Sequence, residues 1–84
     1  MIRLDGNSIG GTLESIFGRD LTIALGVCGG CGAEHHVGAL HVYRAAGIVV
    51  RCPDCEAVLM RIVESPQRTW IDLQGVASMQ ITAD

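Results

Sequence analysis

Four cysteines form two closely spaced pairs and carry the strongest chemical signal in the sequence. Cys28 and Cys31 make the first C-x2-C pair, and Cys52 and Cys55 make the second after twenty intervening residues. Two such pairs about 15 to 20 residues apart are typical of a site in which four thiolates hold one metal ion in a tetrahedron. The spacing therefore predicts that all four cysteines are metal ligands.

The residues around the cysteines favour two tight metal-binding knuckles. Gly29, Gly30 and Gly32 allow backbone N–H groups to approach the thiolates of the first pair. Such hydrogen bonds partly neutralise a site with four negative ligands. Pro53 stiffens the second knuckle but removes one backbone donor.

Zinc is the first choice of metal, and iron is the alternative. Tetrahedral sulfur suits both ions, and a Cys-Pro-x-Cys pair is shared by zinc ribbons and rubredoxins. Against iron, Glu56 stands where a rubredoxin usually has glycine, the two pairs lie closer together, and three aromatic residues are few for a rubredoxin core. Four thiolates leave no open position for water or substrate, so we expect a structural site that contributes about 10 kcal/mol to folding.

Two disulfides and a thioredoxin-type exchange pair are the less favoured alternatives. Residues 1–20 contain charges throughout and no apolar signal segment, and no run of about 18 apolar residues marks a membrane span. The expected location is the cytoplasm, where paired thiols hold metal more often than they form disulfides. Thioredoxin chemistry needs a βαβ unit, which the sequence does not predict.

We expect a non-enzymatic protein, because no catalytic constellation is readable. The acidic residues form no acid–base pair, the serines lack a nucleophile elbow, and the chain has no lysine for a phosphate loop. His35, His36 and His41 are alternative ligands or protonation-sensitive contacts. Because four cysteines already suffice, solvated or partly buried histidines are the favoured interpretation.

Length and charge narrow the function classes further. The 84 residues, 49% of them hydrophobic, predict a single domain over 1–84 with a core small enough to need a metal or disulfide staple. A net charge of -3 argues against a nucleic-acid or membrane-surface protein. Charged residues amount to only 18%, so we expect apolar surface, with Trp70 as the preferred interface residue for a protein partner or for self-association. Four arginines of the expected ribbon are interpreted as scattered and solvated: Arg44, Arg51, Arg61 and Arg68.

One short helix is predicted near the N-terminus, over residues 7–18. Its apolar residues fall on one face, at i, i+4, i+7 and i+8: Ile9, Leu13, Ile16 and Phe17. Asn7 or Ser8 is suited to cap its start, and Gly18 is suited to end it. Leu4 is expected to add to the same face.

A metal-binding ribbon of antiparallel strands is predicted over residues 21–64. Alternation with period two predicts a strand that leads into Cys28. A three-residue turn, with Gly47 at positive φ, then brings the two cysteine pairs together. The expected segments are strands over 21–27 and 36–44, the turn at 45–47, a strand over 48–51, and a strand over 57–63 that is covered on both faces.

Residues 69–82 are predicted to add C-terminal strands. A turn at 65–68 leads into a strand over 69–73, which Gly75 ends. Apolar residues at 77, 79 and 81 favour a final edge strand.

The motifs also carry a family resemblance. The stretches concerned are Leu4-Asp5-Gly6-Asn7, Gly11-Thr12-Leu13, Ile16-Phe17, Thr22 and Ala24 before Cys28, Leu40-His41-Val42-Tyr43, Val50-Arg51-Cys52-Pro53-Asp54-Cys55, and Trp70-Ile71-Asp72-Leu73-Gln74-Gly75. Together they resemble a small bacterial family, mostly of actinobacteria, catalogued as domain of unknown function 6510. The resemblance implies a zinc-ribbon-like protein without an established activity, and it favours an accessory role in an oxidoreductase complex.

The sequence thus predicts a small α+β domain: a zinc ribbon with rubredoxin-like knuckles, antiparallel β-hairpins and one short N-terminal helix. The expected function is a non-enzymatic protein-interaction or accessory module with a structural zinc site. A rubredoxin-like iron electron carrier is the first alternative, and a nucleic-acid-binding ribbon is a less favoured one.

Overall fold

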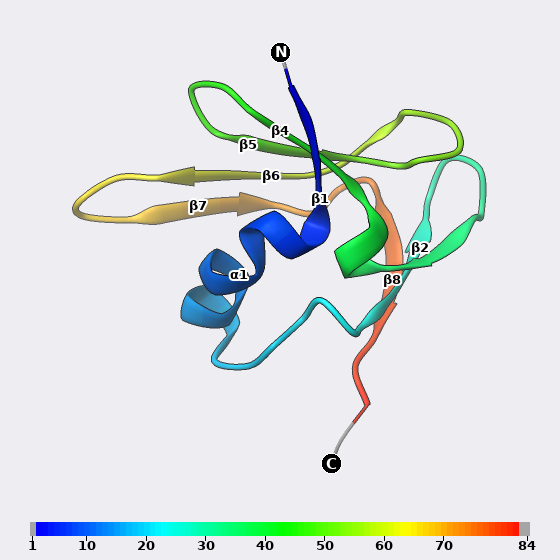
Figure 1. The fold of residues 1–84 in the computed structure, drawn as a ribbon, viewed down its shortest axis with the longest axis horizontal. Helices are drawn as coiled ribbons and strands as arrows, with labels where there is room; N and C mark the ends of the chain where they lie inside the picture. Colours follow the sequence, from blue (N-terminus) through cyan, green and yellow to red (C-terminus); the bar gives the residue numbers. More distant parts are fainter. Residues whose placement is uncertain (1, 83–84) are drawn as a thin grey trace.

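Two antiparallel sheets and one short helix make up the protein, which the computed structural model describes over residues 2–82. The larger sheet has the order β1-β4-β5-β6-β7, and the smaller sheet has the order β3-β2-β8. Figure 1 shows α1 and the smaller sheet on the same side of the larger sheet, with the β6–β7 hairpin projecting from the body. The predicted α+β class with antiparallel hairpins is confirmed. The bounds are β1 (Arg3–Asp5), α1 (Gly10–Phe17), β2 (Leu25–Cys28), β3 (Glu34–His36), β4 (His41–Arg44), β5 (Ile48–Arg51), β6 (Val58–Glu64), β7 (Thr69–Asp72) and β8 (Val76–Gln80).

The core lies between the larger sheet and the segments that cover it. Ile9 and Leu13, from the helical segment, are buried in one cluster with Val42, Val50 and Ile62 from the three central strands. Burying such a side chain fully contributes about 1.5–3 kcal/mol. No polar or charged residue within 2–82 is buried, so the core is wholly apolar.

The helical segment begins with a short 3-10 helix, Gly6–Ile9, before α1. The predicted cap at Asn7 or Ser8 is wrong, because the side chain of Asp5 accepts a hydrogen bond from the Asn7 N–H and so caps the segment. Gly18 ends α1 as predicted, with the left-handed φ of 76°.

Two predicted members of the helical apolar face lie elsewhere. Phe17 is 40% exposed because it sits in the last turn of α1, beyond the reach of the sheet. Leu4 belongs to β1, an unpredicted strand that pairs with β4, and from there it packs against the core.

Two predicted strands of the ribbon are shorter than expected. The first begins at Leu25 instead of residue 21, since residues 22–23 form a turn in which Ile23 is 65% exposed. The strand over 36–44 is interrupted by a 3-10 helix, Val37–Ala39, so that β3 and β4 belong to different sheets. Gly38 lies in this 3-10 helix, where the chain passes from the smaller sheet to the larger one, and its N–H donates to the Thr22 carbonyl oxygen at 2.8 Å.

The turn at 45–47 forms the predicted hairpin between β4 and β5. Gly47 does not have the predicted positive φ. It is required for space instead, because a Cβ there would lie 2.9 Å from the Ile62 carbonyl oxygen.

The strand expected over 57–63 is β6, and it is covered on both faces only at its start. Leu59 and Met60 are both buried, whereas Val63 is 47% exposed. Beyond Met60 only Ile62 is buried, whereas Arg61, Val63 and Glu64 are exposed, so the end of the strand has a covering layer on one face at most.

The last two strands serve different sheets. β7 pairs with β6 in the larger sheet, and β8 crosses over to pair with β2 as the predicted edge strand of the smaller one. Gly75 lies at the crossing: its N–H donates to the Leu59 carbonyl at 3.1 Å, and its carbonyl accepts from the Gly29 N–H at 2.8 Å. Gly75 therefore ties β6 to the first cysteine knuckle. No helix among residues 2–82 has the length and apolar character to cross a membrane.

Candidate metal centre

The two cysteine pairs occupy knuckles that come from different sheets. β2 ends at Cys28 in the smaller sheet, and β5 of the larger sheet leads directly into Cys52. The knuckles, residues 28–33 and 52–57, meet at the junction of the sheets. A metal held here would join the two layers of the molecule.

Both knuckles have the same backbone hydrogen bonds. In the first, the Cys28 carbonyl accepts from Gly32 N–H, and Cys28 N–H donates to Ala33, each at 2.9 Å. In the second, the corresponding bonds join Cys52 to Glu56 and to Ala57, again at 2.9 Å. The repeated pattern turns both cysteines of each pair toward one point.

The four sulfur atoms have the spacing of a tetrahedral site. Cys28 Sγ lies 3.6 Å from Cys55 Sγ, and Cys31 Sγ lies 3.7 Å from Cys52 Sγ. All four Sγ atoms are within 4.8 Å of one another. A tetrahedron with metal–sulfur bonds of about 2.3 Å has edges of about 3.8 Å, so the cluster is compatible with one bound ion. All four cysteines are free thiols, and the disulfide alternative is absent from this arrangement.

Backbone N–H groups donate to sulfur atoms in both knuckles. Gly30 N–H donates to Cys28 Sγ at 3.3 Å, and Asp54 N–H donates to Cys52 Sγ at 3.4 Å. These are also the two buried cysteines, whereas Cys31 and Cys55 are exposed. Each knuckle therefore offers one buried sulfur and one sulfur at the surface.

The thiols of the cluster differ in acidity. The backbone N–H groups of Cys31 and Gly30 lower the pKa of Cys28 to about 7, against the opposing effect of burial. For Cys31 the backbone N–H of Ala33 lowers the pKa, but desolvation and the other three thiols outweigh it and raise the pKa to about 12. Sulfurs this close cannot all carry charge unless a cation offsets their repulsion.

The pKa of Cys55 is raised as well. The Ala57 N–H lowers this pKa, but desolvation and the thiols of Cys28 and Cys52 prevail. At neutral pH, Cys31 and Cys55 are therefore protonated in the metal-free cluster. Any metal that binds four thiolates has to displace their protons.

Binding of one Zn²⁺ at pH 7 is expected to release at least two protons, from Cys31 and Cys55. Since the raised pKa values favour the protonated thiols, affinity should rise with pH and fall on acidification. Calorimetric titration in buffers of different ionisation enthalpy counts the protons. Release of fewer than one proton per ion would show that these two thiols are not ligands.

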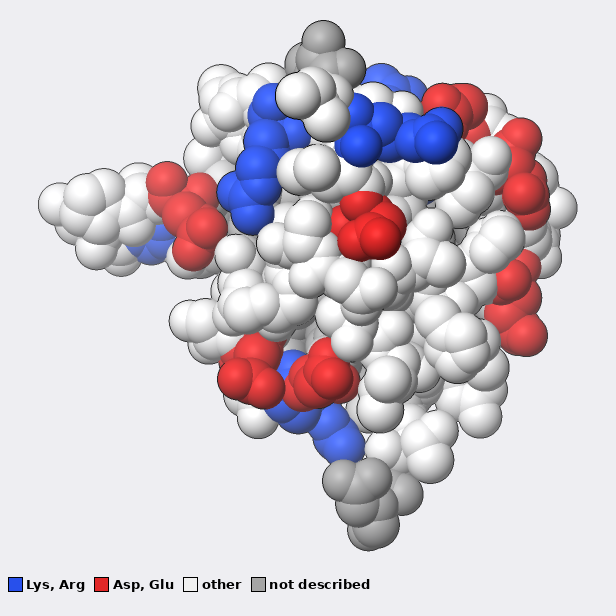
Figure 2. Space-filling model, viewed as in Figure 1, with Lys and Arg blue, Asp and Glu red and all other residues white. Residues whose placement is uncertain are grey.

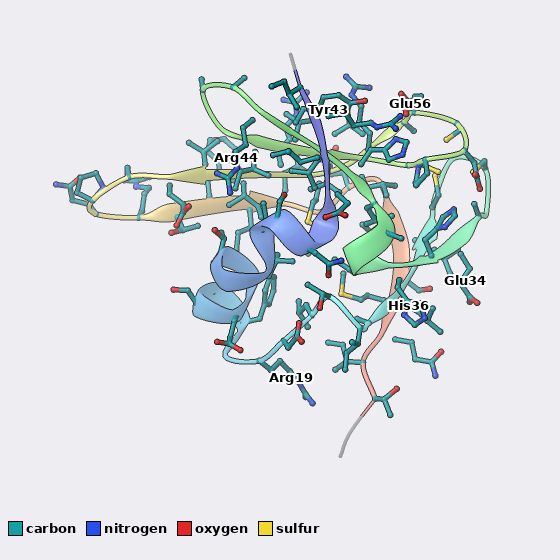
Figure 3. All side chains as sticks on the ribbon, in the orientation of Figure 1. Arg19, Glu34, His36, Tyr43, Arg44 and Glu56 are labelled. Carbon is teal, nitrogen blue, oxygen red and sulfur yellow. The ribbon has the colours of Figure 1, made fainter. Side chains whose placement is uncertain are left out.

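Glu56 has a left-handed backbone, with φ of 65°, in the position that Gly32 occupies at φ of 78° in the first knuckle. Its carbonyl accepts from Arg51 Nη1 at 2.7 Å, and its carboxylate lies 3.4 Å from His41 Nδ1. Figure 3 places Glu56 at the knuckle end of the larger sheet, away from Arg44. The contacts hold a residue other than glycine in a conformation that costs about 1–2 kcal/mol.

Glu56→Gly is expected to raise the free energy of unfolding by about 0.5–1 kcal/mol. Relief of the left-handed backbone exceeds the added entropy of glycine in the unfolded chain, and the exposed His41 contact contributes little. Thermal unfolding of the zinc-loaded protein measures the change. Gly32→Ala is the matched control and should destabilise by about 1 kcal/mol; equal effects of the two changes would contradict the proposed strain.

The three histidines lie beside the knuckles and not in the sulfur cluster. His35 Nε2 lies 3.1 Å from Asp54 Oδ2, and His36 Nδ1 lies 3.1 Å from the Ile23 carbonyl oxygen. The pairs His35–Asp54 and His41–Glu56 could not be predicted from the sequence, since their members are separated by 19 and 15 residues. Such pairs at the surface fit the solvated or partly buried interpretation.

The arginines of the larger sheet do not form one dense patch. Arg51 is held against the second knuckle by its bond to the Glu56 carbonyl. Arg44 and Arg68 are exposed at the turns of two different hairpins, β4–β5 and β6–β7. Figure 2 shows acidic and basic side chains interspersed over the visible face. Trp70, on β7, is 68% exposed.

These features define a class: a small α+β protein of antiparallel sheets with a four-cysteine knuckle site able to bind a metal ion. Comparison with family models gives a match over residues 1–84 to a family of unknown function (DUF6510), and the chain belongs to that family. Searches of curated proteins and of solved structures find no match.

Proposed function

We propose that Cys28, Cys31, Cys52 and Cys55 bind one structural Zn²⁺ and that the protein is a non-enzymatic interaction or accessory module of the cytoplasm. The observation that carries this proposal is the complete set of four Sγ atoms at tetrahedral spacing. Four protein ligands fill the coordination of zinc, which leaves no position at which water or substrate is activated. Zinc would join the two sheets and would not take part in chemistry.

The surface supports the interaction role. Several large apolar side chains are exposed, among them Trp70 at 68%, Ile23 at 65% and Val63 at 47%. Val63 and Trp70 lie opposite each other in the β6–β7 hairpin, and adjoining exposed apolar side chains often mark contact sites for other proteins.

Metal analysis of protein purified without added metal tests the zinc proposal. The expected result is one zinc per chain and no absorption band in the visible range. Red protein with one iron per chain would overturn it.

A one-electron carrier with iron at the same thiols is the second candidate. It is favoured by the exposure of Cys31 and Cys55, which would bring the edge of the cluster to the surface that a reductase contacts. This candidate predicts reversible reduction of the isolated protein in voltammetry. A redox-silent protein with zinc bound eliminates it.

A further inference from the structure

The outer edge of β7 has no partner strand. β7 ends the order of the larger sheet, and among residues 2–82 only β6 pairs with it. Figure 1 shows the tip of the β6–β7 hairpin extending beyond the other elements, with α1 drawn next to the base of β7. Free backbone donors and acceptors on such an edge are a template for pairing with another strand.

The solvent-facing side of this hairpin is apolar at its centre and charged at its base. In the register of the hairpin, Val63 lies opposite Trp70, and Arg61 lies opposite Asp72. These residues alternate with buried Ile62, so they face away from the core. By the same alternation Arg68 lies on the face of Trp70 and Asp72.

The hydrogen bonds of the turn determine which backbone groups of β7 point outward. Ser65 N–H donates to the Arg68 carbonyl at 2.9 Å, so Ser65 and Arg68 form a hydrogen-bonded pair. Hydrogen-bonded and non-hydrogen-bonded pairs alternate along an antiparallel ladder. Continuing from the turn, the next hydrogen-bonded pairs between β6 and β7 are Val63 with Trp70 and Arg61 with Asp72. The backbone groups of Thr69 and Ile71 therefore point to the open edge.

A second copy of β7 fits this edge in a register that uses all these groups. If two β7 strands pair antiparallel with Trp70 opposite Trp70, then Thr69 of each copy lies opposite Ile71 of the other. These two pairs are hydrogen-bonded through the backbone groups that point to the open edge. Arg68 of each copy then lies opposite Asp72 of the other, which places one pair of opposite charges at each end of the interface. Asp72 would lie between Arg61 of its own chain and Arg68 of the second copy.

We propose that the protein forms a two-fold symmetric dimer through antiparallel pairing of β7 with β7, which makes one continuous ten-stranded sheet. The order of Arg68, Trp70 and Asp72 is self-complementary in an antiparallel pair, so this edge favours a second copy of the same chain as its partner. The edge strand β8 has no charged residue that would select such a partner, and the edge strands β1 and β3 have three residues each. This proposal rests on the proposed interaction role and identifies the partner as a second copy of the chain.

Two charge reversals test the register. Arg68→Asp places Asp opposite Asp72 at both ends of the interface, and Asp72→Arg places Arg opposite Arg68. Each variant alone is expected to weaken dimerisation at least about tenfold in sedimentation equilibrium, since like charges directly opposite each other destabilise strand pairs. An equimolar mixture of the two variants restores opposite charges and should form a heterodimer with near wild-type affinity.

The single tryptophan provides an independent signal. Trp70 is 68% exposed in the monomer and would stack against its counterpart in the dimer. Its fluorescence emission should shift to shorter wavelength as wild-type concentration rises, and the shift should disappear in either charge variant. Arg44→Asp, at the other hairpin, makes the same charge change away from β7 and should leave the dimer intact.

The outcomes separate this proposal from the zinc proposal. A wild-type chain that remains monomeric at about 1 mM, or one for which the variants and their mixture all dimerise alike, overturns the β7 dimer. In the first case the edge would accept a strand of a different protein. Zinc content is measured in the same samples: a dimer without bound metal would contradict the zinc proposal and support the β7 pairing.

Discussion

Replacing Cys52 by alanine is expected to abolish both metal binding and cooperative folding. Cys52 is 1% exposed, it receives the Asp54 N–H, and it stands at the end of β5 where the second knuckle begins. Structural zinc contributes about 10–16 kcal/mol in small domains, whereas whole domains are stable by about 5–15 kcal/mol. If loss of one ligand abolishes zinc binding, the free energy lost is therefore as large as the whole free energy of unfolding of the domain.

Circular dichroism during thermal unfolding, with metal analysis of the same sample, measures this effect. Val50→Ala is the matched control because Val50 is equally buried, two residues earlier on β5. It should lower the free energy of unfolding by about 1–3 kcal/mol and leave one zinc per chain. A Cys52→Ala protein that retains zinc and a sharp transition would contradict the ligand assignment.

Gly75→Ala is expected to destabilise the protein by about 3 kcal/mol or more. A Cβ at this position would overlap the Val58 carbonyl oxygen and lie 2.7 Å from Leu59 Cα. Both atoms belong to the backbone of β6, which cannot move without breaking the bonds that tie Gly75 to Leu59 and to Gly29. Overpacking against rigid groups of this kind is costly.

Gly11→Ala is the matched control for Gly75→Ala. Gly11 lies within α1, and a Cβ there meets nothing within 4 Å. Alanine favours the helix by about 1 kcal/mol, so this variant should be stabilised. Denaturant unfolding of the two variants should give shifts of opposite sign. A Gly75→Ala protein as stable as the wild type would show that β6 and the first knuckle are not in fixed contact.

The candidate site was predictable because its information is local. Two residues between cysteines set the knuckle geometry. The turn at 45–47 accounts for the β4–β5 hairpin, whose second strand leads into the second knuckle. Both are encoded in short stretches of sequence, and the structure brings the four cysteines together. Gly18 as the end of the helix was predictable for the same reason.

The parts that were missed depend on distant residues. β1 is three residues long and exists because it pairs with β4, almost forty residues further along the chain. The alternation before Leu25 predicted a strand, yet Ile23 is exposed, since no partner strand is available at that place. The left-handed backbone of Glu56 was also unpredictable: it follows from the knuckle geometry, and glutamate does not favour it.

X-ray absorption at the zinc edge of the purified chain shows whether four thiolates hold one zinc ion. We expect one zinc per chain with four sulfur neighbours at about 2.3 Å and no nitrogen neighbour. A histidine nitrogen at about 2.0–2.1 Å, fewer than four sulfurs, or a folded chain without any metal would contradict it.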